Sequence, residues 1–390
     1  MIYINAYSAI CALGSDNDQI ANALLETKKE YLTKSSHYLK DEKSSYFGVI
    51  NSDLKKIDEF EEHNSRNNRV LATLADRIKV VVEKLKQSYG ADRIGVVMGT
   101  STSGLEETVE ALKVYLDNGS KKNDFKYSHQ EFGSPSNFLC DYLSIKGPAY
   151  TISTACSSSA RALLSAKNLI ESDLCDVVIA GGADTLCSVP INGFDSMSVL
   201  SYDRCIPFNA DRHGINIGEA GGLMVLSKEK SDLVLKAVGQ SSDAYHPSAP
   251  DPSGNGAITA MSLALKEANL DVNDIGYINM HGTATKLNDS MEALAVYNLF
   301  KDSVPCSSTK YLTGHTLGAA GILEACILCL LIDRKIPLPI QDFSKNEVDD
   351  ELHKIKFVNE TMHPKTMNMM SNSFAFGGNN TCVIIGENNE

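Results

Sequence analysis

Three residues of the sequence, one cysteine and two histidines, lie in turns of small side chains where they could do chemistry. Cys156 stands in Thr-Ala-Cys-Ser-Ser-Ser, directly before a stretch typical of a buried helix. A thiol at a helix N-terminus lies at the positive end of the helix dipole, which favours the nucleophilic thiolate. We therefore expect Cys156 to attack acyl groups, although a cysteine chosen at random would more often be plain core.

His281 and His315 offer the acid–base groups that such a nucleophile uses. His281 ends an apolar strand in Met-His-Gly-Thr-Ala-Thr, and ligands bind at that end of the strands in α/β sheets. His315 lies in Thr-Gly-His-Thr-Leu-Gly, five residues after Lys310. Each histidine alone would more often be structural. Their combination with Cys156 indicates a catalytic site.

Apolar runs that alternate with amphipathic stretches must position these residues. Helices are expected over 69–85 and 157–170. The expected strands cover residues 2–6, 93–98, 176–180, 222–227, 275–280 and 381–386. This alternation predicts an α/β fold with largely buried sheets.

A faint internal repeat indicates a duplicated α/β unit. The strand at 93–98 and the strand at 275–280 each run into Gly-Thr, and each is later followed by a small-residue turn that opens a buried helix. We expect an N-terminal half, residues 1–235, that carries the nucleophile and an insertion over about 104–150. The C-terminal half, 236–390, carries both histidines. Residues 53–68 and 241–255 are expected to be exposed connections.

Composition excludes several classes of protein. The 390 residues include 36 Lys+Arg and 49 Asp+Glu, a net charge of −13, which argues against a nucleic-acid partner. With 43% apolar residues the chain can form a core, so disorder is not expected. The longest apolar run, 322–332, is too short to span a membrane and is interrupted by Glu324. No export signal is recognised at the N-terminus, so we expect a cytoplasmic protein.

The ten cysteines are expected to be free thiols in that compartment. Cys326 and Cys329 form a lone C-x-x-C inside the predicted buried helix. Without a second pair nearby, packing is a better interpretation than a metal or redox role. We expect no metal site.

Four motifs together resemble the β-ketoacyl-acyl-carrier-protein synthases of the thiolase superfamily, over nearly the whole chain. They are Thr-Ala-Cys-Ser-Ser, His-Gly-Thr-Ala-Thr, Ser-Thr-Lys-x4-His-Thr-x-Gly-Ala-Ala-Gly and Asn-Ser-Phe-x-Phe-Gly-Gly-x-Asn. The resemblance implies a thiolase-like fold, a duplicated five-layered α-β-α-β-α architecture. It is to the elongating Cys-His-His type, because the initiating type has asparagine where His315 stands.

The resemblance implies a decarboxylative Claisen condensation. Cys156 would hold the acyl chain as a thioester, and the backbone N–H groups of Cys156 and Phe376 would form the oxyanion hole. His281 and His315 would contact the malonyl thioester and help to expel carbon dioxide.

The resemblance also implies supporting residues around this centre. Lys310 would support His315 and pair with Glu292, because buried charges need partners. The further residues are Asp289 behind the site, Thr283 and Thr285 on the pantetheine arm, and Phe374 and Phe376 beside the thiol, with Phe376 as gate. Ala375 stands where the family usually has glycine, and we expect it to stiffen the gate.

No tightly bound cofactor is implied, since the substrates would be carried on the 4'-phosphopantetheine of acyl carrier protein. Docking of that acidic protein would need a local basic patch. The candidates are Lys55, Lys56, Arg66 and Arg69 in one segment, and Lys121, Lys122 and Lys126 in another. The resemblance implies a homodimer, or a heterodimer with a homologous chain-length factor. The resemblance implies chain elongation in fatty acid or in polyene and polyketide synthesis. The motifs are closer to synthases of dedicated pathways, such as those of aryl polyenes or other type II polyketides.

Two other classes of protein fit the sequence less well. A thiolase acting on coenzyme A thioesters would need a second cysteine as base near the C-terminus, but Cys382 belongs to a strand pattern. A non-catalytic chain-length factor would lack the nucleophile, whereas Cys156, His281, His315 and Lys310 are all present.

Overall fold

Ten strands of the described part of the chain form the sheet that organises the molecule. The computed structural model describes residues 1–26, 29–120, 125–341, 343 and 347–388. In this part of the chain the strand order is β10-β9-β11-β12-β8-β1-β7-β6-β4-β5. β1 and β8 are joined by the pairs Ile2 with Leu235 and Tyr3 with Val234. The sheet therefore consists of two five-stranded halves that meet at one end of β1 and β8.

The strands of each half come from one part of the sequence. The first half contains β1 (Ile2–Cys11), β4 (Ile94–Gly99), β5 (Ala149–Ile152), β6 (Val177–Asp184) and β7 (Ala220–Ser227). The second half contains β8 (Leu233–Ser242), β9 (Ile275–Asn279), β10 (Cys306–Ser307), β11 (Asn368–Phe374) and β12 (Asn379–Glu387). A separate hairpin pairs β2 (Thr33–Ser35) with β3 (Ser45–Phe47).

The two halves have the same topology. The order β5-β4-β6-β7-β1 in the first corresponds to β10-β9-β11-β12-β8 in the second. In each half the first two pairings are parallel and the last two antiparallel. This symmetry confirms the predicted duplication. β8 begins at Leu233, slightly before the expected boundary, and we propose that the second half begins with this strand.

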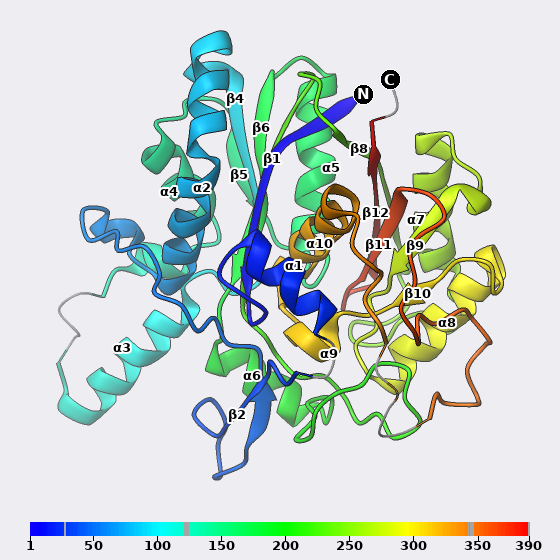
Figure 1. Ribbon diagram of the computed structural model, residues 1–390. Helices are drawn as coiled ribbons and strands as arrows, with labels where there is room; N and C mark the ends of the chain where they lie inside the picture. Colours follow the sequence, from blue (N-terminus) through cyan, green and yellow to red (C-terminus); the bar gives the residue numbers. More distant parts are fainter. Residues whose placement is uncertain (27–28, 121–124, 342, 344–346, 389–390) are drawn as a thin grey trace.

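The helices lie on both faces of the two half-sheets (Figure 1). The α-helices are α1 (Asn17–Leu25), α2 (Arg66–Tyr89), α3 (Leu105–Asn118), α4 (Ser134–Leu143), α5 (Ser158–Glu171), α6 (Ser188–Ser196), α7 (Asn255–Ala268), α8 (Lys286–Phe300), α9 (Lys310–Thr313) and α10 (Ala320–Arg334). Short 3-10 helices are η1 (Glu61–His63), η2 (Ala91–Arg93), η3 (Tyr127–Gln130), η4 (Val272–Asp274) and η5 (Leu317–Ala319).

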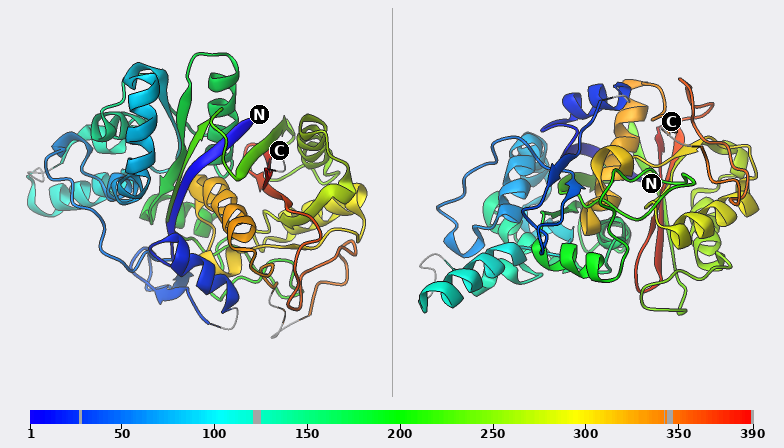
Figure 2. Two further views of the ribbon diagram at one scale, coloured as in Figure 1. Left: turned by 45° about the horizontal axis from the view of Figure 1, so that its top comes forward. Right: turned by 90° about the horizontal axis from the view of Figure 1, so that it is seen from below.

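These helices and half-sheets form five layers. α5 and α10 lie between the half-sheets, α2 and α4 cover the outer face of the first, and α7 and α8 cover the second (Figures 1 and 2). The buried apolar side chains divide in the same way, into a central core around α5 and α10 and an outer core on either side. The predicted α-β-α-β-α architecture is confirmed.

α10 can occupy the central layer because it is apolar on every side. Residues 320–332 are all buried, as expected for a helix without a polar face. A side chain at Gly321 would come within 2.7 Å of Ala160 in α5, so glycine permits the close approach of the two helices. Cys326 and Cys329 are buried free thiols in this helix, which agrees with a packing role.

Some local expectations were wrong. α2 begins at Arg66, inside the segment expected to be an exposed connection, and Asn67 and Asn68 are buried. Ser65 caps this helix, since its side chain accepts a hydrogen bond from the N–H of Asn68 at 3.2 Å. The segment predicted as an insertion, about 104–150, contains α3 and α4. Among the described residues, no helix combines the length and the apolar character needed to cross a membrane.

Candidate active site

The turn between β5 and α5 presents Cys156. Ala155, just before it, has a left-handed backbone with φ of 51°, a conformation that costs energy and often marks functional sites. The hydroxyl of Ser158 donates to the carbonyl of Ala155 at 2.6 Å and holds this turn. The cysteine is buried with 7% of its surface exposed, yet it lines a cavity.

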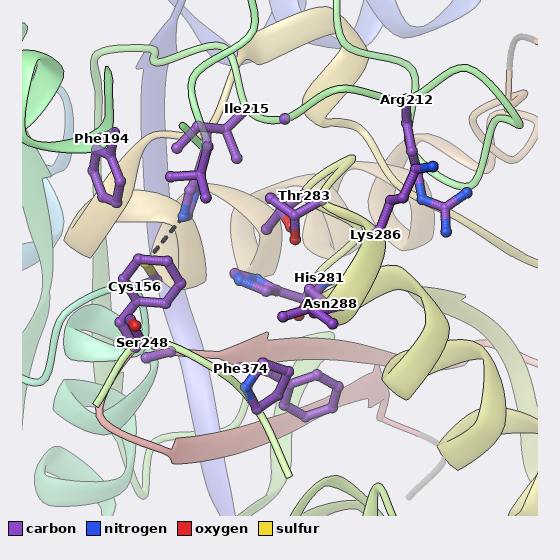
Figure 3. A pocket seen from close by; sticks show the side chains of 18 of the residues that line it. Cys156, Phe194, Arg212, Ile215, Ser248, His281, Thr283, Lys286, Asn288 and Phe374 are labelled. Carbon is purple, nitrogen blue, oxygen red and sulfur yellow. Dashed lines mark hydrogen bonds between the residues drawn. The ribbon is translucent and has the colours of Figure 1, made fainter. Parts of the chain in front are cut away.

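His315 contacts the thiol directly. Its Nε2 lies 2.9 Å from Sγ of Cys156 (Figure 3). The segment before β7 holds the backbone of this histidine. The N–H of His315 donates to the carbonyl of Asn216 at 2.6 Å, and the N–H of Gly218 donates to the backbone carbonyl of His315 at 3.0 Å. A side chain at Gly218 would meet the carbonyl oxygen of Thr313 at 2.2 Å. The glycine therefore allows the contact that places His315.

Glu292 holds the turn that carries His281, at the end of β9. The N–H groups of His281 and Gly282 donate to its two carboxylate oxygens, each at 2.7 Å. The side-chain amide of Asn372 donates to it as well, at 3.2 Å. The rings of His281 and His315 lie edge to face with centroids 5.3 Å apart. Two histidines from the second half thus meet a cysteine from the first.

Lys310 pairs with Glu324 of α10, and the expected pair with Glu292 is wrong. The Nζ of Lys310 forms an ion pair with Glu324, and both side chains are buried. Glu292 is instead occupied by the turn after β9. Sequence reasoning missed the role of Glu324, although a signal existed, because a lone carboxylate in an apolar helix needs a buried partner.

Burial controls the charge state of the three central side chains. It raises the pKa of the Cys156 thiol to about 12, although Lys310 and the N–H groups of Phe376 and Cys156 lower it. Burial, and then Lys310, hold the pKa of both His281 and His315 well below the usual range. The resting site therefore holds a thiol beside neutral imidazoles. This differs from the thiolate expected from the helix dipole, because desolvation outweighs it.

Asp289 organises the turn between β9 and α8. It accepts hydrogen bonds from the N–H groups of Thr283 at 3.1 Å, Ala284 at 3.2 Å and Phe208 at 2.7 Å. Ala284 has a φ of 64°, so this turn needs such support. The guanidinium of Arg212 lies 3.5 Å from the same carboxylate. Asp289 is thus a buried anchor for the segment that follows His281.

A cavity of about 330 Å³ gives access to the thiol and both imidazoles (Figure 3). The hydroxyls of Thr283 and Thr285 lie 3.0 Å apart on its wall. Its other predicted lining residues are Phe374 and Phe376. Sequence reasoning did not single out Phe194, Arg212 or Lys286, which also line it. Within the described residues, Cys156, His281 and His315 are the group whose atoms could together hold a metal ion.

The loop after β11 turns at its glycines and not at Ala375. Gly377 and Gly378 have φ values of 85° and 74°, whereas the backbone of Ala375 is outside the left-handed region. The N–H of Ala375 donates to the carbonyl of Asn379 at 2.9 Å. Alanine is therefore accommodated without strain, and the expected stiffening has no basis in the backbone.

Four of the basic residues proposed for docking, Lys55, Arg66, Arg69 and Lys126, have partners. Lys55 pairs with Asp76 at 3.2 Å, Lys126 with Glu62 at 3.0 Å, and Arg66 with the buried Glu219 at 2.6 Å. The guanidinium of Arg69 donates a hydrogen bond to the side-chain oxygen of Asn64 at 2.8 Å. Lys121 and Lys122 lie outside the described residues. These pairs reduce the positive potential that the sequence indicated.

The chain matches two family models that together span most of its length. The model described as Beta-ketoacyl synthase, N-terminal domain, covers residues 2–232, and the model described as Beta-ketoacyl synthase, C-terminal domain, covers 233–344. The chain belongs to the β-ketoacyl synthase family, whose members are acyltransferases. The match confirms the predicted class of enzyme.

Three known proteins are similar to this chain in sequence, two of them over nearly its whole length and one over three quarters of it. A solved ketosynthase (ApeO), in complex with its chain length factor (ApeC) from Xenorhabdus doucetiae, is 47% identical, with 99% of this chain and 98% of that chain covered and a TM-score of 0.96. The 3-oxoacyl-[acyl-carrier-protein] synthase 2 of Rhizobium meliloti (strain 1021) is 34% identical over 312 residues, 75% of this chain and 73% of the relative. Nodulation protein E of the same strain is 29% identical over 411 residues, 98% of each chain.

Proposed function

We propose that the protein condenses an acyl group held on Cys156 with a malonyl group, both delivered on the phosphopantetheine of acyl carrier protein. The observation that carries this proposal is the 2.9 Å contact between Sγ of Cys156 and Nε2 of His315 beside an open cavity. In the first step the sulfur attacks the thioester carbonyl, and the carrier thiol leaves with the proton that Cys156 gives up. The acyl group is then a thioester of Cys156.

We assign two backbone donors to the oxyanion that forms in this attack. The backbone N–H groups of Phe376 and Cys156 both act on the thiol sulfur, whose pKa they lower. The carbonyl oxygen of an acyl group bonded to that sulfur would lie within reach of the same groups. Fixed backbone dipoles are effective here because they need no reorganisation as negative charge develops.

The second step uses the two neutral imidazoles. An uncharged histidine donates one hydrogen bond, so His281 and His315 can both donate to the carbonyl oxygen of the malonyl thioester. Loss of carbon dioxide leaves an enolate on that oxygen, which the two donors stabilise. Its carbon attacks the acyl thioester of Cys156, the C–S bond breaks, and the departing sulfur takes up one proton from solvent, which is the proton that the overall reaction consumes. Lys310 supports this arrangement from behind, with Glu324 as its counter-ion.

The wall of the cavity suits a pantetheine arm. Thr283 and Thr285 present hydroxyls to it, and Phe374 and Phe376 present rings. The ring of Phe376 packs against Phe194 of α6 at 5.7 Å, so a movement of Phe376 would open the space toward α6. We assign the acyl chain to that side and the pantetheine to the side of the threonines.

We infer that the enzyme works as a heterodimer with a homologous chain-length factor. The support is the 47% identical ketosynthase that was solved with its chain length factor. β5 also ends the sheet in the described part of the chain, and an unpaired edge strand is a site for pairing. α3, which packs against η3 and α6, exposes Leu112, Tyr115 and Leu116, an apolar surface of the kind that a partner covers.

A dedicated polyketide pathway, such as one making aryl polyenes, is the setting that we propose for this pair. Free thiols at all ten cysteines support a cytoplasmic location. The thiolase alternative lacks support, because Cys382 lies buried within β12.

The acyl-loading step tests the proposal. The protein, alone and co-expressed with its homologous partner, is incubated with acyl-loaded carrier protein and its intact mass is measured. We expect an acyl adduct on the wild type and on Cys140→Ser, which changes the one half-buried cysteine, and none on Cys156→Ala. An adduct that persists in Cys156→Ala would refute the assignment of the nucleophile.

A further inference from the structure

Three side chains at the centre of the site each offer an atom that can bind a metal ion. One nitrogen from each of His281 and His315 and the sulfur of Cys156 all lie within 4.8 Å of one another. They come from three separate segments: the turn before α5, the end of β9 and the loop before η5. We propose that these three side chains bind one Zn²⁺ ion, which blocks the nucleophile and so inhibits the enzyme reversibly. The inhibition, unlike the binding, rests on the function proposed above.

The chemistry of the ligands suits zinc. Zn²⁺ binds thiolate sulfur and imidazole nitrogen, and three protein ligands with an open fourth position are typical of its accessible sites. The cavity that these side chains line can supply a water molecule in the fourth position. Hard cations such as Mg²⁺ prefer oxygen ligands and are not expected to bind.

The geometry needs a small adjustment only. Zn–S and Zn–N bonds of about 2.3 and about 2.0 Å at tetrahedral angles place sulfur and nitrogen roughly 3.5 Å apart. Nε2 of His315 lies 2.9 Å from Sγ, so these two atoms must separate slightly. The remaining distances, at most 4.8 Å, must close. Rotations of three side chains that border a cavity can provide both movements.

The surroundings predict a reversible site and not a permanent one. Zinc-binding histidines usually donate a hydrogen bond from their second ring N–H to an oxygen atom. Here Nδ1 of His281 and Nδ1 of His315 have no hydrogen-bond partner. The cation of Lys310 also lies nearby and repels a metal ion, although Glu324 neutralises much of its charge. Binding replaces the thiol proton by the metal, so one proton is released for each ion bound.

Metal titration of the purified protein tests the site without an activity assay. Co²⁺, a spectroscopic substitute for Zn²⁺, is added to metal-free protein, and the thiolate charge-transfer absorption is recorded; Zn²⁺ is then added to displace it. We expect one equivalent to bind, with release of one proton. Alkylation of Cys156 should abolish the signal, and His281→Ala or His315→Ala should weaken binding by at least about tenfold, since loss of even an outer partner costs that much.

Matched controls separate this site from adventitious binding. Cys140→Ser and His353→Gln replace a half-buried cysteine and an exposed histidine, and both should bind like the wild type. Binding that survives in both histidine variants, a signal lost in Cys140→Ser, or no stoichiometric binding would overturn the proposal. Acyl loading measured with a chelator present separates the two claims. Loading without metal binding refutes the metal site alone, and metal binding without loading refutes the proposed reaction alone.

Discussion

Lys310 of α9 and Glu324 of α10 form an ion pair in which both side chains are buried. The pair lies beside the two histidines, whose pKa values Lys310 lowers. A buried cation without its counter-ion is costly, so Glu324 allows Lys310 to act from this position. The pair therefore links the central helix layer to the chemistry of the site.

Removal of Glu324 should destabilise the fold. Glu324→Gln leaves a buried ammonium without an opposite charge, and we expect the free energy of unfolding to fall by about 3 kcal/mol or more. The control is Glu171→Gln, which removes a half-exposed partner of Lys167 and should cost less than about 1 kcal/mol. Urea denaturation measures both. Equal losses in the two variants would show that the buried pair has no special importance.

Replacement of the whole pair should separate stability from catalysis. Lys310→Met combined with Glu324→Leu removes both charges, so the double variant should recover most of the stability lost in Glu324→Gln. The pKa of His281 and His315 should rise, because a nearby cation is gone. We expect loss of malonyl decarboxylation in a folded protein. Full decarboxylation activity in this variant would exclude a role for Lys310.

Glu292 should make stability depend on pH. Burial raises its pKa to about 7, from about 4.5 in an unfolded chain. The folded state thus holds a proton that the unfolded state has lost in this range, and the contribution of Glu292 to stability falls as pH rises from about 4.5 to about 7. His281 and His315, with lowered pKa values, give the opposite slope, so a difference between variants is needed.

The comparison is with Glu292→Gln, whose amide resembles the protonated acid. The stability difference between wild type and variant should move in favour of the variant as pH rises from about pH 5 to about pH 8. Urea denaturation at each pH gives the difference. A difference that stays constant, or moves toward the wild type, would mean that Glu292 is ionised throughout.

Alkylation of Cys156 should report a thiol and not a thiolate. Burial raises the pKa of Cys156 to about 12. The rate of its reaction with iodoacetamide should therefore still rise steeply at about pH 9, where the rate of an ordinary thiol, with a pKa of about 8.5, begins to level off. Mass spectrometry of the labelled peptide measures the rate. A plateau that begins near neutral pH would indicate a thiolate–imidazolium pair and would support the helix-dipole prediction instead.

Gly378 should be more important to the loop after β11 than the residue at position 375. Gly378 has a φ of 74°, and a side chain there would meet Cβ of Asp243 at 3.0 Å. Gly378→Ala should therefore strain the loop and slow acyl loading. Ala375→Gly introduces no clash and should leave loading within about twofold, since its cost is a few tenths of a kcal/mol up to about 1 kcal/mol of stability. The reverse order of effects would place the hinge at 375.

The fold could be predicted from the sequence where local patterns are strong. The strands near residues 94 and 275, with their Gly-Thr ends, revealed the duplication, and Cys156, His281 and His315 each lie in a turn that the sequence marks. β10 has two residues, and β11 has polar residues at 368, 371, 372 and 373 without a regular alternation, so both carry little local signal. Their place in the sheet depends on neighbours far along the chain.

Long-range pairing explains the errors at the site. Glu324 and Glu292 are both acids in helices that follow a catalytic motif, and only the packing of α10 against the site decides which one meets Lys310. Arg66 likewise reads as a surface cation, although it binds Glu219, 153 residues away. The charge state of Cys156 depends on desolvation, which no local motif encodes.

A single turnover of the loaded enzyme tests the central claim most directly. The protein, with its partner chain where one copurifies, is acylated on Cys156, freed of donor and mixed with malonyl-loaded carrier protein, and intact masses are followed in time. We predict loss of the acyl adduct together with release of carbon dioxide and appearance of a carrier-bound 3-oxoacyl product, and no such loss in His315→Ala. An adduct that is stable to malonyl-loaded carrier protein, or that is released as free acid without a condensed product, would contradict the account.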